Sequence, residues 1–362
     1  MKLILTALFM VASAQADRIN IGAYPSSTLE RLKKLYPDQS EAFIQKRLDN
    51  AKTPFEKWRS FPPYYFELLT RLNHSQEKKI NSRRGLCAGD PHLENFGFIY
   101  ASKPHFTLND LDDVSECSLD ADVLRLLVGY RLLGASSVTN FILAYLEGLK
   151  GTNAPYPQFL LNLEQDSMNK KTQLPKKYKK LAEASVCDGD FSPVTDEEDK
   201  ALEDFTSTEN KIYIKACAHL KDSGGSAGNK RFVVFHKAGA FELKPLAQPA
   251  PLYQEITPIL VRQEIFTNAV GAFYSESLKT EYYPVTLKNL SYQRRPIWGG
   301  NSGINQDELT PKDLNEIMLY QAQTLGKLHR ITNPSPVLMD IEEFERTVET
   351  IERKWRSEFA EQ

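Results

Sequence analysis

Apolar residues recur at helical spacing over both ends of the chain. Leu29, Leu32 and Leu35 follow a run of serine and threonine that can cap a helix. An aromatic-rich helix is expected to end near residue 72, with its rings in the core, because aromatic side chains bury large apolar areas. The same spacing predicts further helices at residues 26–50, 120–129, 140–150, 252–274, 314–331 and 340–359, the last of them on the surface.

The pattern changes near residue 211, where apolar and polar residues begin to alternate. Residues 211–216, 232–235 and 241–244 are expected to be strands separated by glycine-containing turns, and residues 282–296 are expected to form a hairpin. Helices, then strands, then helices again in a chain of 362 residues indicate an α+β fold with two lobes.

Two acidic motifs lie between the early helices and these strands. The first, residues 89–95, reads G-D-P-H-L-E-N, and the second, residues 109–113, reads N-D-L-D-D. The apolar segment between them is broken at Lys103-Pro104 and predicts strand, turn, strand. A loop with Asp and Asn, then a hairpin and another Asp, is the plan by which kinase-like phosphotransferases hold nucleotide and magnesium.

This plan predicts a role for each polar residue. Asp90 is expected to accept the proton of the attacking hydroxyl. Asn95 and Asp110 are expected to hold Mg²⁺, a hard cation that prefers oxygen ligands, with Asp112 or Asp113 near a second metal ion. A metal-dependent hydrolase is disfavoured, because the motif contains one histidine and no second histidine stands at ligand spacing.

Three motifs together carry a family resemblance. G-D-x-H-x-x-N-F-G at residues 89–97, L-N-D-L-D-D at 108–113 and D-V-L-R-L at 122–126 resemble the bacterial domain-of-unknown-function family 2252, which shows similar motifs in this order. Leu111 stands where that family usually has Phe, and it keeps an apolar anchor. The family's core is similar to aminoglycoside and choline phosphotransferases, so the resemblance implies a protein-kinase-like fold. In such folds the residue corresponding to Asp122 braces the catalytic loop through backbone hydrogen bonds.

The later strands carry the second half of the expected site. Gly224, Gly225, Ser226 and Gly228 lie in a turn whose small residues let backbone N–H groups approach phosphates. Lys244, on the third strand, is expected to pair with phosphate oxygens. Both segments resemble the family's G-V-G-S-V-G and L-Q-V-K-E-A segments.

The helix that follows offers two acids, Glu255 and Glu264, that could pair with Lys244 and position it. Spacing alone does not choose between them. Either could equally be an exposed surface residue.

The order of these motifs differs from that of ordinary kinases, in which the glycine-rich lobe precedes the catalytic loop. The helix at 314–331 ends in L-x-x-L-H and resembles the helix that precedes the catalytic loop in small-molecule phosphotransferases. We therefore expect a circular permutation, which is tolerated because domain termini usually lie at the surface. The expected parts are a signal peptide at 1–16, a helical lobe with the catalytic and metal-binding loops at 17–205, a β-rich nucleotide-binding lobe at 206–298, and helices at 299–362 that complete the helical lobe.

The N-terminus has the pattern of a secretory leader. Lys2 precedes an apolar run at residues 3–11, and Ala14-Gln15-Ala16 has the form of a signal-peptidase site. We therefore expect export to the periplasm or the exterior. The four cysteines match no zinc motif and could form up to two disulfides, with Cys87–Cys117 one conceivable pair; buried free thiols remain an equal alternative.

Charge and hydropathy exclude other classes. A net charge of −2 disfavours non-specific nucleic-acid binding, and no apolar run is long enough to span a bilayer.

The expected activity is transfer of a phosphoryl group from ATP, or another nucleoside triphosphate, to a hydroxyl of a small molecule. No long activation loop with an A-P-E-like end follows Asp110, which disfavours a protein acceptor. The alternative is an exported, non-catalytic, kinase-like protein that binds a nucleotide or other phosphorylated ligand, because ATP is scarce outside the cytoplasm. Nucleotidyl transfer at the same site is a third possibility.

Overall fold

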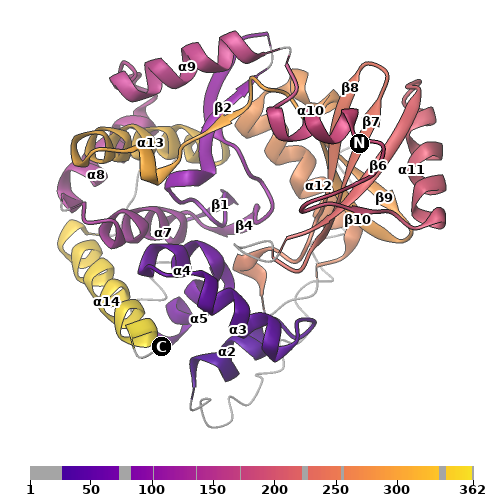
Figure 1. Cartoon of the computed structure of the whole chain (residues 1–362). Helices are drawn as coiled ribbons and strands as arrows, with labels where there is room; N and C mark the ends of the chain where they lie inside the picture. The colour runs from indigo at the N-terminus through magenta and orange to yellow at the C-terminus, as the bar shows by residue number, and fades with distance from the viewer. Residues whose placement is uncertain are drawn as a thin grey trace, which may run out of the picture.

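The computed structural model describes residues 27–72, 83–100, 102–135, 137–171, 173–221, 227–253, 257–333 and 340–360. The chain is a mixed α+β structure, as expected, with most helices on one side and a large antiparallel sheet on the other (Figure 1). The expected signal peptide lies outside the described residues.

Four short helices open the described chain: α2 (Thr28–Leu35), α3 (Glu41–Asn50), α4 (Pro54–Ser60) and α5 (Pro62–Arg71). The single helix expected at 26–50 is two helices, because the turn that contains Pro37 separates α2 from α3 and Ser40 caps the second. Ser27 and Glu30 form a capping box at the start of α2.

Four longer helices build the centre of the helical side. They are α7 (Leu119–Leu132), α8 (Val138–Lys150), α13 (Pro311–Thr332) and α14 (Ile341–Ala360). Helices α8 and α13 approach closely, since a Cβ at Gly148 would lie 2.0 Å from the Gln323 carbonyl oxygen and one at Gly326 would lie 2.2 Å from that of Tyr145.

Helix α14 belongs to the core and not, as expected, to the surface. Trp355 is fully buried, with its ring centroid 4.6 Å from that of Trp58, and its Nε1 donates to the Pro54 carbonyl at 3.1 Å. Phe359 packs against Trp355 and Tyr64. The aromatic residues of α4 and α5 are buried in the same cluster, which confirms their predicted core role.

The large sheet has the strand order β5-β6-β7-β8-β10-β9, and all of its neighbours are antiparallel. Its strands are β5 (Ser192–Pro193), β6 (Tyr213–Leu220), β7 (Lys230–His236), β8 (Gly239–Pro245), β9 (Tyr283–Leu287) and β10 (Leu290–Pro296). The strands predicted from residue 211 and the hairpin at 282–296 are confirmed. Lys288 and Asn289 close that hairpin with positive φ angles of 49° and 65°.

Helices cover both faces of this sheet. Leu202 of α11 (Asp196–Thr208) packs with Phe232 and Phe241 on one face. Leu181 of α10 (Lys176–Glu183) packs with Val233 on the other. The elements that pack with the sheet therefore begin before residue 206, where the β-rich lobe was expected to start. We call α10, β5, α11 and β6–β10 the strand lobe. We call α2–α5, α7, α8, α13 and α14, together with the segments that carry the two acidic motifs, the helical lobe.

Two small sheets carry the acidic motifs. Strand β1 (Arg84–Cys87) pairs with β4 (Ser115–Ser118), and β2 (Phe96–Tyr100) pairs with β3 (Pro104–Leu108) and β11 (Ser302–Gly303). Within the described ranges, the remaining α-helices are α9 (Gln158–Lys170) and α12 (Ile259–Ala269), and a π-helical turn at Val270–Tyr274 follows α12. The helix expected at 252–274 thus begins only after Pro258, where the chain can turn into α12.

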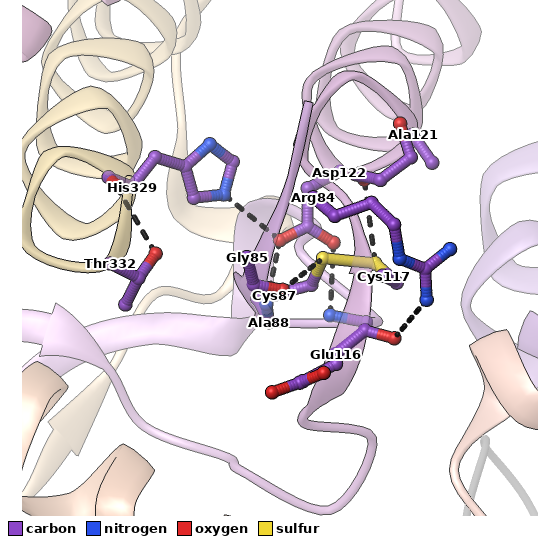
Figure 2. The surroundings of a disulfide bond; sticks show 12 residues. Arg84, Gly85, Cys87, Ala88, Glu116, Cys117, Ala121, Asp122, His329 and Thr332 are labelled. Carbon is purple, nitrogen blue, oxygen red and sulfur yellow. Dashed lines mark hydrogen bonds and ion pairs between the residues drawn. A yellow bond between two sulfur atoms is a disulfide. The ribbon is translucent and has the colours of Figure 1, made fainter. Parts of the chain in front are cut away.

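All four cysteines are paired. Cys87–Cys117 joins β1 to β4 (Figure 2), and Cys187–Cys217 joins the segment after α10 to β6. Cys87 and Cys117 lie near Asp122, but their sulfurs bond to each other and are not available as thiolate ligands. Among the described helices, none combines the length and apolarity needed to cross a bilayer.

Replacing Trp355 with Ala should lower the free energy of unfolding by about 3–5 kcal/mol, because a fully buried aromatic side chain is removed from the core. Lys354→Ala, one residue earlier on the exposed face of α14, is the control and should change stability by less than about 0.5 kcal/mol. Urea denaturation measures both. Equal stability of the two variants would contradict the core role of α14.

Candidate functional site

The first acidic motif begins where β1 ends, and a carboxylate of α7 holds it. Asp122 accepts hydrogen bonds from the backbone N–H groups of Ala88 at 2.6 Å and Gly89 at 2.9 Å. This is the structural role expected for Asp122. His329 of α13 lies 3.1 Å from the same carboxylate through Nε2 (Figure 2). Its Nδ1 is 2.8 Å from the Tyr145 hydroxyl.

The conformation of Gly89 explains why glycine precedes Asp90. Its φ is +77°, and a Cβ at this position would lie 2.0 Å from the backbone carbonyl oxygen of Asp113. An L-residue would therefore be strained in its own backbone and would collide with the second acidic motif. The two motifs are in direct contact at this point.

Asp90 is buried and paired with an arginine from α7. Arg125 donates through Nε to Asp90 Oδ1 at 2.7 Å, and its Nη2 lies 2.5 Å from the same oxygen. Asp90 Oδ2 is 3.7 Å from His92 Nε2. Burial raises the pKa of Asp90 to about 8, although the Arg125 charge lowers it. Burial also holds the pKa of His92 well below its usual range, so the imidazole is neutral.

The β2–β3 hairpin brings the remaining predicted ligands together. Asn95 precedes β2 and Asp110 follows β3, so pairing of Phe96 with Leu108 leaves both at one end of the hairpin. The backbone carbonyl of Asn95 accepts from the Asn109 N–H at 3.0 Å. Asn95 donates its side-chain Nδ2 to the Asp90 carbonyl at 2.9 Å, which leaves its Oδ1 available.

Lys244 reaches this acidic group from the strand lobe. Its Nζ lies 2.8 Å from Asp110 Oδ1 and 2.6 Å from Oδ2, and it also forms an ion pair with Asp112. Gln293, directly opposite Lys244 on β10, donates to Asp112. Lys244 is 1% exposed, so the two distant parts of the chain meet in a buried contact.

A polar row on the sheet extends from Lys244. Glu242 lies two residues earlier on the same face of β8, and it pairs with Arg295 at 2.5 Å and Arg231 at 3.4 Å. Burial raises the pKa of Glu242, but Arg295 and Arg231 outweigh it and hold that pKa at about 2. The sheet therefore presents alternating positive and negative side chains to the acidic motifs.

The pKa values of Asp110 and Asp112 are shifted in opposite directions. Burial acts to raise the pKa of Asp110, but Lys244 and Arg295 hold it well below the usual range. Burial and the adjacent Asp110 charge raise the pKa of Asp112 to about 6. Lys221 also interacts with the charges of this site. Burial and the neighbouring cations Arg231 and Lys244 lower the pKa of Lys221 to about 8. The site thus places carboxylates close to other carboxylates and cations close to other cations.

The donors at this site suit a hard divalent cation. The carboxylates of Asp110 and Asp112 and the amide oxygen of Asn95 are oxygen ligands of the kind that Mg²⁺ prefers. Burial and the neighbouring Asp110 charge raise the pKa of Asp112, and a bound cation would act in the opposite direction by stabilising the carboxylate. Asp113 is directed elsewhere, because its Oδ1 accepts from the Ala250 backbone N–H at 2.7 Å.

The structure thus brings together Asp90, Asn95, Asp110, Asp112 and Lys244. Three residues of the expected glycine-rich turn, Gly224, Gly225 and Ser226, lie outside the described residues, as does Glu255. Glu264 is exposed on α12, and the acids that pair with Lys244 are instead Asp110 and Asp112.

Gly228, the described member of the turn, contacts the helical lobe. Its φ is +85°, and a Cβ there would lie 3.0 Å from Gln39 Nε2 and 3.3 Å from the Phe43 ring. Gln39 donates to the Ala227 carbonyl at 2.9 Å and accepts from Arg47 Nη1 at 2.6 Å. The beginning of α3 therefore fastens the β6–β7 turn to the helical lobe.

Several residues of this site were not predicted. They are Arg125, Lys221, Arg231, Glu242, Gln293 and Arg295. Strand alternation could have placed Glu242 on the same face as Lys244, and Gln293 on the same face as Arg295. Their cross-strand partners could not be found, because the register depends on pairing between strands far apart in sequence.

Comparison with known proteins gives one match. Residues 69–140 match the sequence model of a family described as an uncharacterized protein conserved in bacteria (DUF2252). The matched stretch contains both acidic motifs, Asp122 and Arg125, and it ends before Lys244. No curated protein and no solved structure matches the chain. The chain is therefore similar to this bacterial family over the part that carries the acidic motifs.

Gly89→Ala should destabilise the protein by more than Gly134→Ala, which is the matched control. Both glycines have positive φ, but a Cβ at Gly134 would meet nothing within 4 Å. The control should cost about 1–2 kcal/mol from backbone strain alone. The Gly89 variant adds the collision with Asp113, and equal losses in urea denaturation would argue against that contact.

Replacing Asp112 with Asn should change how stability depends on pH. Burial and Asp110 raise the pKa of Asp112 to about 6 in the folded protein, so the folded state binds this proton more tightly than the unfolded state does. The resulting stability is fully present below the usual aspartate pKa and is lost as the pH rises through about 6. Wild type should therefore lose stability relative to Asp112→Asn between about pH 4 and 6, measured by urea denaturation without divalent cations. The exposed Asp38→Asn is the control, and a constant difference for Asp112→Asn over this range would refute the expectation.

Proposed function

We propose that this protein is a kinase-like phosphotransferase that moves the γ-phosphoryl group of ATP, or another nucleoside triphosphate, to a hydroxyl of a small molecule. The observation that carries the proposal is the buried contact between Lys244 of the strand lobe and Asp110 of the second acidic motif. Phosphoryl transfer requires a lysine for phosphates and an acid for metal at one place, and these residues come from segments that are 134 positions apart.

Each polar residue of the site has its own proposed role in the transfer. Asp90 orients the acceptor hydroxyl and takes its proton as the oxygen bonds to the γ-phosphorus; the bond from that phosphorus to the β-bridging oxygen breaks, and the nucleoside diphosphate leaves. Asn95, Asp110 and Asp112 would hold Mg²⁺, which supplies charge neutralisation at the phosphates. Lys244 would pair with phosphate oxygens, and the cations around Lys221 favour the same polyanion.

The fold we propose is a circularly permuted kinase-like arrangement. The helix α13 supports it, since α13 lies late in the sequence yet its His329 contacts Asp122, the brace of the catalytic loop. The helix that ends in L-x-x-L-H is therefore next to the loop it would precede in an unpermuted chain. The glycine-rich turn is proposed to cover the phosphates from the strand lobe.

A second candidate function is favoured by the two disulfides. Paired cysteines are typical of oxidising compartments, in agreement with the leader-like N-terminus and with a proposed periplasmic or extracellular location. Because nucleoside triphosphates are scarce there, the alternative is a non-catalytic protein that binds a nucleotide or another phosphorylated ligand at the same site.

Two variants separate these functions. With Mg²⁺ and labelled ATP, Asp90→Asn should lower turnover by at least about 100-fold, because the proton acceptor is lost, while nucleotide binding stays within about threefold. Lys244→Met should instead weaken nucleotide binding by about tenfold or more, because a charge-assisted contact is lost. Scintillation counting of released phosphate and isothermal calorimetry give the two readouts.

Asp38 is exposed, so Asp38→Asn is the control, and it should match wild type in turnover and in nucleotide binding. Turnover that survives Asp90→Asn would refute the catalytic role. Mg²⁺-dependent binding without turnover in wild type would establish the non-catalytic candidate.

A further inference from the structure

The first two turns of α7 hold the catalytic loop at two separate points. Asp122 fixes its backbone through Ala88 and Gly89, and Arg125, three residues later on the helix, contacts the side chain of Asp90. Residues three apart lie on the same face of a helix, so one rigid element supplies both contacts. We propose that Arg125 is a positioning residue that sets the orientation of the Asp90 carboxylate for proton transfer, a role that rests on the proposed phosphotransferase function.

The side chain of Arg125 is itself held by several neighbours. It is fully buried, its guanidinium carbon lies 4.8 Å from the ring centroid of Trp58 and 5.2 Å from that of Tyr65, and its Nη2 donates to the Trp58 carbonyl at 3.0 Å. A guanidinium held by two rings and a carbonyl has little freedom to rotate. The carboxylate that it contacts is therefore held in one orientation.

The contact distinguishes the two oxygens of Asp90. Arg125 approaches Oδ1 through both Nε and Nη2, whereas Oδ2 lies on the side of His92 at 3.7 Å. Oδ1 is thus committed to the guanidinium, and Oδ2 is the oxygen left to meet the acceptor hydroxyl. A lysine could supply the positive charge but not the planar fork that contacts the carboxylate and the Trp58 carbonyl together.

A second buried arginine, which pairs with an aspartate of the same helix, gives a matched control. Arg83 forms a buried pair with Asp120 at the start of α7, with Nε 3.1 Å from Oδ1, and it also donates to the Tyr145 hydroxyl at 3.2 Å. This pair is as buried as Arg125–Asp90, but its carboxylate is not the proposed catalytic group. Loss of Arg83 therefore reports the structural cost of removing a buried arginine from the α7 region.

The test compares Arg125→Lys, Arg125→Met and Arg83→Met in steady-state ATP turnover, MgATP binding by calorimetry and thermal unfolding. The proposal expects both Arg125 variants to lower kcat by about 100-fold with KM for ATP within about threefold, because the phosphate and metal residues are intact and the proton acceptor is misplaced. Arg83→Met should lose comparable thermal stability and keep kcat within about twofold of wild type. Equal losses of kcat in Arg83→Met and Arg125→Met, or full activity in Arg125→Lys, would overturn the positioning role.

A crystal structure of Arg125→Lys gives a readout that does not need turnover. The proposal expects the Asp90 carboxylate to be rotated from its wild-type orientation while Ala88 and Gly89 keep their bonds to Asp122. An unmoved carboxylate would overturn the proposal even if wild type shows no transfer. Absence of both binding and turnover in wild type would instead count against the phosphotransferase function.

Discussion

The ion pairs of Lys244 with Asp110 and Asp112 are the interaction on which the contact between the strand lobe and the acidic motifs depends. Removing a charge from water costs several kcal/mol per ion unless partners compensate for it. Lys244 is almost fully buried, and both carboxylates are partly shielded from water, so neither the lysine nor the carboxylates would be compensated alone. The strand lobe and the acidic motifs therefore meet as one charge-compensated set, in which Gln293 and the Glu242–Arg295 pair are the nearest supports.

Behind this contact, a buried hydrogen-bonded chain connects helices to the start of the first acidic motif. Tyr145 of α8, His329 of α13 and Asp122 of α7 follow one another and end on the backbone of Ala88 and Gly89. Each of the three helices packs in the main core, so these hydrogen bonds restrain the backbone of Ala88 and Gly89 relative to that core. The polar residues of the first acidic motif are supported in this way by the main hydrophobic core.

The sequence predicts the local elements and one half of the site well, for a physical reason. Strand alternation and helix capping are short-range, and they identify the strands after residue 211 and the helices that carry Asp122 and His329. The acidic motif residues meet because a short hairpin joins them. Arg125 and Glu242 could not be assigned partners, because a buried ion pair depends on tertiary packing that no local pattern contains. Helix α14 was expected at the surface, since its many charged residues conceal a narrow buried face that contains Trp355.

The two disulfides join pairs of cysteines that are each 30 residues apart, one within the helical lobe and one within the strand lobe. On the chain-entropy view, each disulfide raises the free energy of the unfolded chain by about 3–4 kcal/mol, because it reduces the conformational entropy of that chain. Neither crosses from one lobe to the other. Covalent reinforcement is thus confined to the interior of each half. Among the described residues, separation of the two halves is opposed by reversible contacts such as the hydrogen bond of Gln39 with Ala227, for which water can compete.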